Sequence, residues 1–132
     1  MGAQIMIVED DYITAADIET QLTAWGYSVC CITDNGDDAK RCAERYRPDL
    51  VLMNINLWGE IDGLEAAARI KECFGIPIIF ISGYKQDSLL RKMMSFDPFW
   101  YLGKPVDDKK LMLTIELALA NGARDLSWKG PR

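Results

Sequence analysis

The chain has 132 residues, of which 49% are hydrophobic and 27% are charged, and its formal net charge is −5. That length predicts a single globular domain with a sizeable core, and no apolar run approaches the roughly 18–20 residues of a transmembrane helix. The acidic balance disfavours non-specific binding to nucleic acid or to a membrane surface, because both need basic surface charge.

The absence of histidine and the spacing of the cysteines limit the kinds of catalytic and metal site that the chain could contain. The chain has no histidine, which excludes a histidine nucleophile, a histidine general base and a phosphohistidine. Its four cysteines form no CxxC pair, so a zinc site is disfavoured and buried, reduced thiols are expected. The first residues lack the anatomy of a signal peptide. We therefore expect a cytoplasmic protein with no direct contact with nucleic acid or membrane.

Five apolar segments alternate with helical patterns along the chain. In order, strands are predicted at Gln4–Val8, Tyr27–Thr33, Leu50–Asn54, Ile76–Ile81 and Phe99–Leu102, with helices at about 12–25, 37–47, 63–74, 87–96 and 107–121. Strands that alternate with helices of about a dozen residues are typical of βαβ units with right-handed crossovers. The sequence thus predicts an α/β fold, built as a doubly wound parallel sheet with helices on both faces.

The segments between these elements contain turn-forming residues. Residues 56–62 are predicted to be a loop, and Gly122 is predicted to end the last helix as a C-cap glycine. Residues 123–132 combine glycine, proline and charges without any periodicity. We expect a domain of residues 1–122 followed by a C-terminal tail or linker stub at 123–132.

Polar residues follow the predicted strands where each one ends. Glu9-Asp10-Asp11 follows the first strand, Asn54 is the last residue of the third, and Ser82 follows the fourth. In a parallel sheet these ends share one edge, where ligands bind. Asp10 or Asp11 could cap the next helix, but three acidic residues in a row favour binding of a hard cation such as Mg²⁺.

Two further residues at this edge have both a structural and a functional reading. Ser82 could cap the following turn or donate its hydroxyl to an anion. Lys104, just past the last predicted strand, could be solvated, or it could offset the carboxylates or hold a phosphate oxygen. Neither residue alone indicates a particular activity.

Taken together, four motifs resemble those of response regulator receiver domains, over residues 4 to about 121. They are Glu9-Asp10-Asp11, residues 48–57 followed by Asp62-Gly63, residues 78–83, and residues 101–105. The resemblance implies a flavodoxin-like five-stranded parallel sheet of order 2-1-3-4-5. It also implies a part in two-component (phosphorelay) signal transduction, with a histidine kinase or a phosphotransfer domain as partner.

The resemblance assigns roles to individual residues. It implies that Glu9, Asp10 and the backbone carbonyl of Asn56 bind Mg²⁺. It also implies that Ser82 and Lys104 bind phosphoryl oxygens, and that Tyr101 changes its rotamer as a switch. Phosphoryl transfer depends on positioning and charge neutralisation, so a cation on one side of the phosphate and an ammonium on the other are expected.

Asn54 departs from the family pattern, which has an aspartate as phosphoacceptor. An amide oxygen is a far poorer nucleophile than a carboxylate, so the chain as written is expected not to form an aspartyl phosphate. The site also loses one negative charge, so Mg²⁺ should bind more weakly. Two explanations stay open: an atypical receiver that acts by protein contact alone, or an engineered replacement of an aspartate that locks the unphosphorylated state.

A rival class of function is a flavodoxin-like small-molecule binder or a Mg²⁺-dependent hydrolase. A flavin site would need a phosphate-binding loop after the first strand, whereas Glu9-Asp10-Asp11 repels phosphate unless a cation intervenes. A phosphatase would need a carboxylate nucleophile at a strand end, and Asn54 is not one. Both features favour the receiver over an enzyme.

The last predicted helix is more apolar than one buried face requires. Leu113 and Leu117 form a second stripe, and Trp100 is expected to point outward near it. The structural reading is a deeply packed helix. The functional reading is a homodimer or partner surface on the fourth helix, fifth strand and fifth helix, as in the receiver family.

Overall fold

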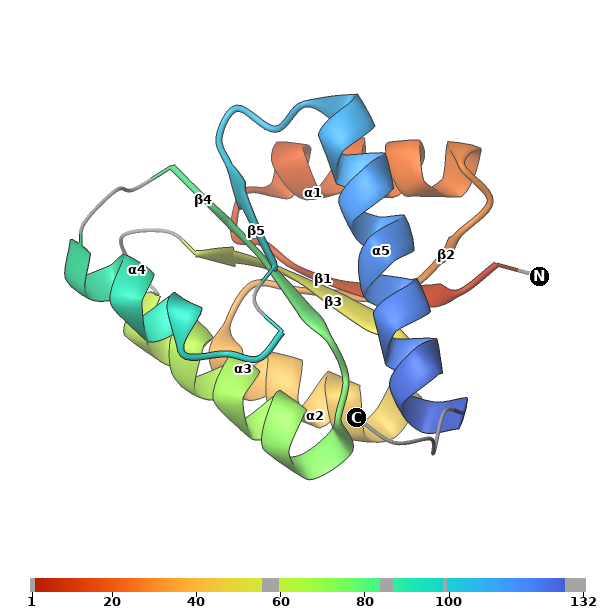
Figure 1. Ribbon diagram of the computed structural model, residues 1–132. Helices are drawn as coiled ribbons and strands as arrows, with labels where there is room; N and C mark the ends of the chain where they lie inside the picture. The colour runs from red at the N-terminus through yellow and green to blue at the C-terminus, as the bar shows by residue number, and fades with distance from the viewer. Residues whose placement is uncertain (1, 56–59, 84–86, 99, 128–132) are drawn as a thin grey trace.

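A computed structural model of the protein describes residues 2–55, 60–83, 87–98 and 100–127 (Figure 1). The strands are β1 (Gln4–Val8), β2 (Ser28–Thr33), β3 (Leu50–Ile55), β4 (Ile78–Ser82) and β5 (Trp100–Gly103). The helices are α1 (Tyr12–Ala24), α2 (Gly36–Tyr46), α3 (Glu60–Phe74), α4 (Asp87–Met94) and α5 (Asp108–Ser127). All paired strands are parallel, in the order β2-β1-β3-β4-β5, which confirms the predicted fold.

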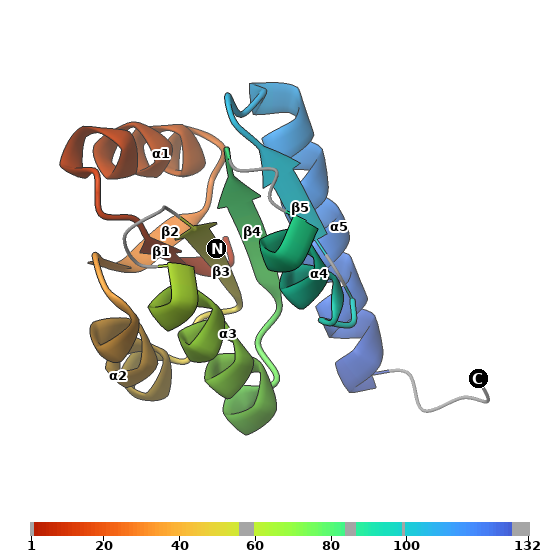
Figure 2. The ribbon, with the colours of Figure 1, turned by 90° about the vertical axis from the view of Figure 1, so that its left-hand side faces the viewer.

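The helices form a layer on each face of the sheet, with α1 and α5 on one side and α2, α3 and α4 on the other (Figure 2). Successive residues of a strand point to opposite faces. Leu50 and Leu52 of β3 therefore pack in the core beneath α1 and α5, whereas Val51 and Met53 pack in the core beneath α2, α3 and α4. Burial on both faces explains why β3 and β4 are continuous apolar runs rather than alternating ones.

Glycines in left-handed conformations end two of the helices. Gly26, which follows α1, has φ 95°, and Gly75, which follows α3, has φ 67°. Only a residue without Cβ adopts these angles at low cost. Both positions end a helix as the sequence predicted.

Two predicted boundaries differ most from the structure. The third helix begins at Glu60, inside the segment predicted as loop, and the last helix continues through Gly122 to Ser127. Glycine disfavours a helix interior by only about 1 kcal/mol relative to alanine, and the neighbouring Ala120, Ala123 and Arg124 are good helix formers. The division into a domain of residues 1–122 and a tail stays a prediction.

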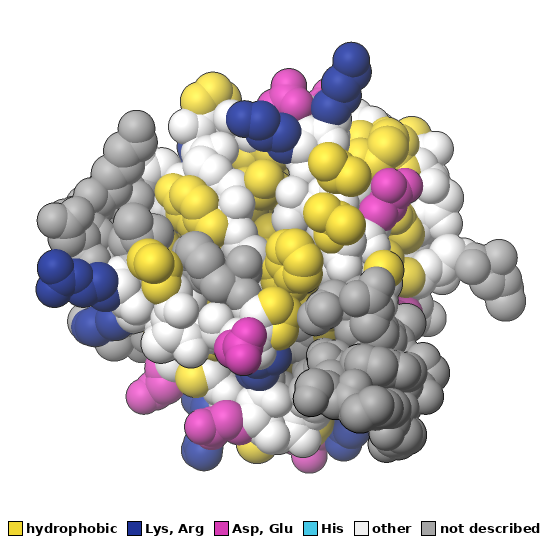
Figure 3. Space-filling model, in the orientation of Figure 1, with side chains coloured by type: hydrophobic (Ala, Val, Ile, Leu, Met, Phe, Trp, Pro, Cys, Tyr) yellow, Lys and Arg dark blue, Asp and Glu magenta, His cyan; other side chains and the backbone are white. Residues whose placement is uncertain are grey.

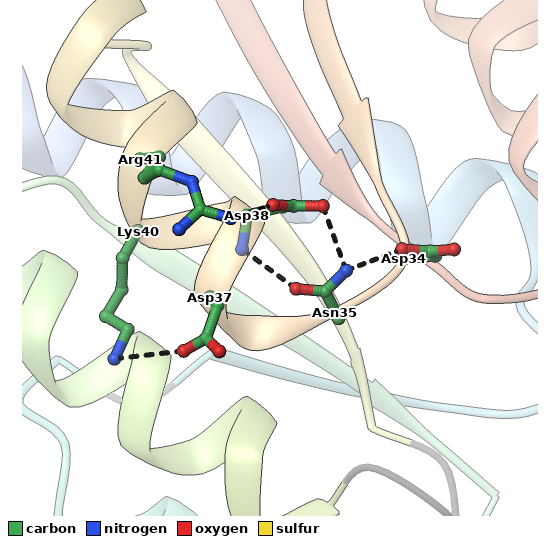
Figure 4. Close-up of polar contacts among 6 residues, drawn as sticks. All are labelled: Asp34, Asn35, Asp37, Asp38, Lys40 and Arg41. Carbon is green, nitrogen blue, oxygen red and sulfur yellow. Dashed lines mark hydrogen bonds and ion pairs between the residues drawn. The ribbon is translucent and has the colours of Figure 1, made fainter.

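A polar cluster organises the turn between β2 and α2 (Figure 4). The Asn35 side chain accepts a hydrogen bond from the backbone N–H of Asp38 (2.8 Å), and its amide donates to Asp34 (2.8 Å) and Asp38 (3.0 Å). Arg41 pairs with Asp38 one turn further along α2. This network, which we call the α2 cap, satisfies an orphan N–H at the helix start.

Candidate functional site

Strand register brings the predicted site residues to one edge of the sheet. Val8 is opposite Met53, so Glu9 and Asn54 follow as neighbours at the ends of β1 and β3. On the other side, Ser82 is opposite Ile55 and Gly103. Residues from four separate segments therefore converge, as the positions of the motifs predicted.

The three acidic residues after β1 have different environments. Asp11 caps α1, because its Oδ1 accepts hydrogen bonds from the backbone N–H groups of Ile13 (3.0 Å) and Thr14 (3.4 Å). Hydrogen bonds from Thr14 and Ile13 also lower the pKa of the Asp11 carboxyl. Asp10 is exposed, and Glu9 is only 3% exposed. Capping thus accounts for one member of the run and leaves two for another role.

Glu9 is buried with incomplete hydrogen bonding. Its Oε2 accepts from the backbone N–H of Asp11 at 2.8 Å, while its Oε1 is buried and finds no hydrogen-bond partner among the described residues. Burial raises the pKa of Glu9, and the neighbouring Asp10 raises it further, whereas the Asp11 N–H and the positive charge of Lys104 lower it. A carboxylate oxygen held in this way is available to a cation.

These residues fit a Mg²⁺ site in their donor chemistry. Mg²⁺ takes oxygen ligands and is bound through one or two carboxylates, with several waters retained. Glu9 supplies an unpartnered buried carboxylate oxygen, and Asp10 supplies a second carboxylate beside it. No group of three histidine, cysteine, aspartate or glutamate side chains that could hold a metal occurs in the described part of the chain. The carbonyl of Asn56, the further predicted ligand, lies outside the described residues.

The backbone carbonyl of Ser82 links three predicted site residues. It accepts hydrogen bonds from the backbone N–H of Lys104 and from the Tyr101 hydroxyl, both at 3.1 Å. Ser82 is fully buried, and the Tyr101 ring packs against the core beneath α2, α3 and α4. A displacement of Ser82 would therefore act directly on both Lys104 and Tyr101.

Asn54 lies on the face of the sheet that α1 and α5 cover, opposite to the face on which the Tyr101 ring packs. Both polar atoms of its side chain, Oδ1 and Nδ2, are buried, and neither has a hydrogen-bond partner within the described ranges. Asn54 and Lys104 are among the residues around a cavity of about 340 Å³ between α1 and the segment joining β5 to α5. Buried polar groups are normally paired, so this amide calls for an explanation.

Sequence reasoning did not find one polar residue at this edge. Thr33, the last residue of β2, is 8% exposed, and its hydroxyl has no partner among the residues that the structure describes. Its backbone carbonyl accepts the N–H of Glu9 at 2.8 Å. Its place at a strand end just before a turn was a weak signal, because that position does not distinguish a buried hydroxyl from an exposed one.

Comparison with known proteins establishes the family. The model of the response regulator receiver domain matches residues 5–116. The transcriptional regulatory protein PdtaR of Mycobacterium tuberculosis is 29% identical over 117 residues, covering 89% of this chain and 57% of that protein. The uncharacterized transcriptional regulatory protein YbdJ of Bacillus subtilis is 37% identical over 116 residues, covering 86% of this chain and 49% of that protein.

Solved structures agree with this assignment. The signal receiver domain of a modulated diguanylate cyclase from Desulfovibrio desulfuricans G20 superposes with a TM-score of 0.87 at 38% identity, covering 95% of this chain and 99% of that one. The chain belongs to the response regulator receiver domains. It is therefore a signalling domain of two-component systems and not a conventional enzyme, and receiver domains typically bind Mg²⁺ and partner histidine kinases.

Two further facts concern the length of the chain relative to its relatives and the character of its helices. The chain spans about half the length of the two curated relatives named above. No described helix has both the length and the apolar character needed to cross a membrane.

Proposed function

We propose that Asn54 occupies the phosphoacceptor position of this receiver domain and that the chain as written does not accept a phosphoryl group. The observation that carries this proposal is the place of Asn54 at the end of β3, beside Glu9 in the strand register and in one cavity with Lys104. A carboxylate there would lie between an acidic pair and an ammonium. The amide lacks the charged oxygen that attacks phosphorus.

The residues around Asn54 have the chemistry that phosphoryl transfer needs. Glu9, Asp10 and the Asn56 carbonyl would hold Mg²⁺, which neutralises charge on phosphoryl oxygens when bound. The Ser82 hydroxyl donates to a phosphoryl oxygen, and the Lys104 ammonium offsets the charge of another. These groups position a phosphodonor from a histidine kinase or a phosphotransfer domain in line with the acceptor side chain.

The switch we propose runs through Ser82. A phosphoryl group drawn to the Ser82 hydroxyl shifts the residue whose carbonyl holds the Tyr101 hydroxyl and the Lys104 N–H. The Tyr101 ring then changes its rotamer and alters the surface beside β5. With asparagine at the acceptor position, the covalent trigger for this movement is missing.

The experiment restores the acceptor. The unaltered protein and Asn54→Asp are each incubated with Mg²⁺ and acetyl phosphate, and intact mass is measured. We expect one labile phosphoryl adduct on Asn54→Asp and none on the unaltered chain, because only the carboxylate can form an acyl phosphate. Asn54→Asp combined with Lys104→Ala serves as the control and should lose most of the adduct. An adduct on the unaltered chain, or none on Asn54→Asp, would contradict the proposal.

A contact surface on α5 supports the alternative of a receiver that acts by protein contact. Leu113 and Leu117 are 56% and 49% exposed, so deep packing does not explain them, and Met94 of α4 is 56% exposed. Figure 3 shows hydrophobic side chains over the face that carries α5. Trp100 does not project into solvent as the alternation predicted. It is half-buried against the core beneath α1 and α5, because its position in β5 has the same parity as Leu102.

We propose that Leu113 and Leu117 form the centre of a homodimer contact. Leu113→Ser with Leu117→Ser should lower the mass measured by multi-angle light scattering at high protein concentration. Glu116→Ser, an exposed residue on the same helix, is the control and should leave the mass unchanged. A monomeric mass for the unaltered chain at every concentration would exclude the dimer.

A further inference from the structure

A groove of about 710 Å³ runs beside β2, along the outer edge of the sheet. Its lining comes from α1, from the end of β2 and from α2. Because α1 and α2 cover opposite faces of the sheet, a groove lined by both passes across the edge strand between them (Figure 2). The α1 side contributes the small side chains of Ala15 and Ala16, which leave room beside the strand.

The backbone of β2 is open on this side, because β2 ends the described sheet. A β-bulge interrupts its pairing with β1 after Val29, but residues 31–33 pair in regular register with residues 6–8. The Thr33 carbonyl accepts the N–H of Glu9, on the β1 side. Backbone groups of successive strand residues point to opposite sides, so the N–H and C=O of Ile32 point away from β1. An edge of this kind is a template for another strand.

The side chains of the groove combine apolar surface with negative charge. Ile32 is 40% exposed, and Tyr12, at the start of α1, is 89% exposed. Asp10, Glu19 and Asp34 are exposed acidic residues of the same lining. An extended segment that alternates apolar residues with lysine or arginine therefore matches both features of the groove.

The charge also argues against a second copy of this chain as the occupant. Arg41, the basic residue of the described lining, pairs with Asp38, so negative charge stays in excess. A second copy would set the same acidic side chains against these ones, and its net charge is −5. Like charges placed together disfavour association, and natural edge strands use charge to avoid pairing with one another. A partner of opposite charge meets no such barrier.

We propose that the outer edge of β2 binds an extended basic segment of a partner protein. The segment adds to the sheet as a further strand, pairs its backbone with Ile32, and places its lysine or arginine side chains beside the exposed acidic residues. In this mode main-chain hydrogen bonds supply affinity and alternate side chains supply specificity. The β2 edge lies at the opposite end of the sheet from β5, so it is distinct from the contact proposed for Leu113 and Leu117.

The test is an NMR titration of the ¹⁵N-labelled full chain, with Mg²⁺ in the buffer so that lysine does not simply replace a cation at Glu9 and Asp10. The probe is the peptide Lys-Val-Lys-Val-Lys, acetylated and amidated at its ends. Glu-Val-Glu-Val-Glu reverses its charge, and Lys-Pro-Lys-Pro-Lys keeps the charge but removes two backbone N–H groups. We expect the probe to cause saturable shifts at Ile32 and to slow hydrogen exchange of the Ile32 N–H. Both control peptides should bind at least about tenfold more weakly.

Variants of the chain test the backbone and the charge separately. Ile32→Pro removes the outward N–H at an edge position, where proline is tolerated, and should weaken binding of the probe about tenfold. Ile32→Val keeps that N–H and should bind normally. Glu19→Lys should also weaken binding, whereas Glu116→Lys, on the exposed surface of α5, should not.

Three outcomes would overturn the proposal. The first is the absence of a saturable shift with Lys-Val-Lys-Val-Lys. The second is equal binding of Lys-Pro-Lys-Pro-Lys, which would reduce the interaction to attraction between charges. The third is a shift of the Ile32 amide with protein concentration alone, because a second copy would then occupy the edge. The peptides are compared on the unaltered chain, so the result holds whether or not Ile32→Pro folds.

Discussion

Two polar clusters lie at the same edge of the sheet and differ in how their hydrogen-bonding capacity is used. In the α2 cap, the Asn35 amide accepts from the backbone of Asp38 and donates to two carboxylates, all near the surface (Figure 4). In the strand-end cluster, oxygen or nitrogen atoms of Glu9, Thr33 and Asn54 are buried without partners within the described part of the chain. Two asparagines thus have opposite environments.

The difference shows where the fold gains stability and where it keeps capacity for a ligand. A satisfied cap contributes about 1 kcal/mol to the helix that it starts. A buried donor or acceptor without a partner costs about 1–3 kcal/mol. The strand-end cluster therefore lowers stability in the isolated chain, and a cation or ligand that pairs these atoms would recover that cost.

The largest expected effect comes from replacing Asn54 by leucine. The change removes both unpaired polar atoms and adds apolar surface beside Ile81, its neighbour on β4, so the free energy of unfolding should rise by about 1–3 kcal/mol. Urea denaturation in EDTA measures it. Asn54→Asp, of the same shape but charged, should be destabilised under the same conditions. A loss of stability in Asn54→Leu would mean that the amide has a partner in solution.

A smaller effect of opposite sign is expected at the α2 cap. Asn35→Ala should lower the free energy of unfolding by about 1 kcal/mol, because the Asp38 N–H loses its acceptor. Asn35→Ser keeps a capping oxygen, so its free energy of unfolding should lie between those of Asn35→Ala and the unaltered chain. Equal stability of the unaltered chain, Asn35→Ala and Asn35→Ser would contradict the stabilising role given to the α2 cap.

Asn35→Ala should also change how the free energy of unfolding depends on pH. Hydrogen bonds from Asn35, and then from Arg41, lower the pKa of Asp38. A lowered pKa in the folded state adds stability above the ordinary aspartate pKa that is lost as the pH falls through the lowered value. Asn35→Ala should therefore lose less stability on acidification, which thermal melts from neutral to acidic pH would show.

The smallest effect is expected at Glu9, and its sign depends on metal. Burial raises the pKa of this carboxyl in the folded state, so its contribution is most favourable below the ordinary glutamate pKa and is lost as the pH rises through the raised value. Glu9→Gln should therefore be more stable than the unaltered chain near neutral pH in EDTA. In Mg²⁺ the order should reverse, because the variant loses a ligand. Thermal melts with and without Mg²⁺ report both signs.

The sequence predicted the elements of the fold and most of the site. Apolar runs of strand length identified all five strands, and polar residues after Val8, Met53 and Ile81 identified the edge at which they converge. The end of α5 was missed because a single glycine does not stop a helix whose other residues favour it. Thr33 was missed because no local pattern distinguishes a buried hydroxyl at a strand end from one that points into solvent.

What the sequence determined by itself is the alternation of strands and helices and the chemistry at each strand end, including an amide at position 54. These depend on residue type and short-range periodicity. Only the tertiary structure decided that Asp11 caps a helix while Glu9 is buried, and that the Asn54 amide is buried without a partner among the described residues. Burial and pairing depend on strand register and on helices far away in the chain, and no local pattern contains that information.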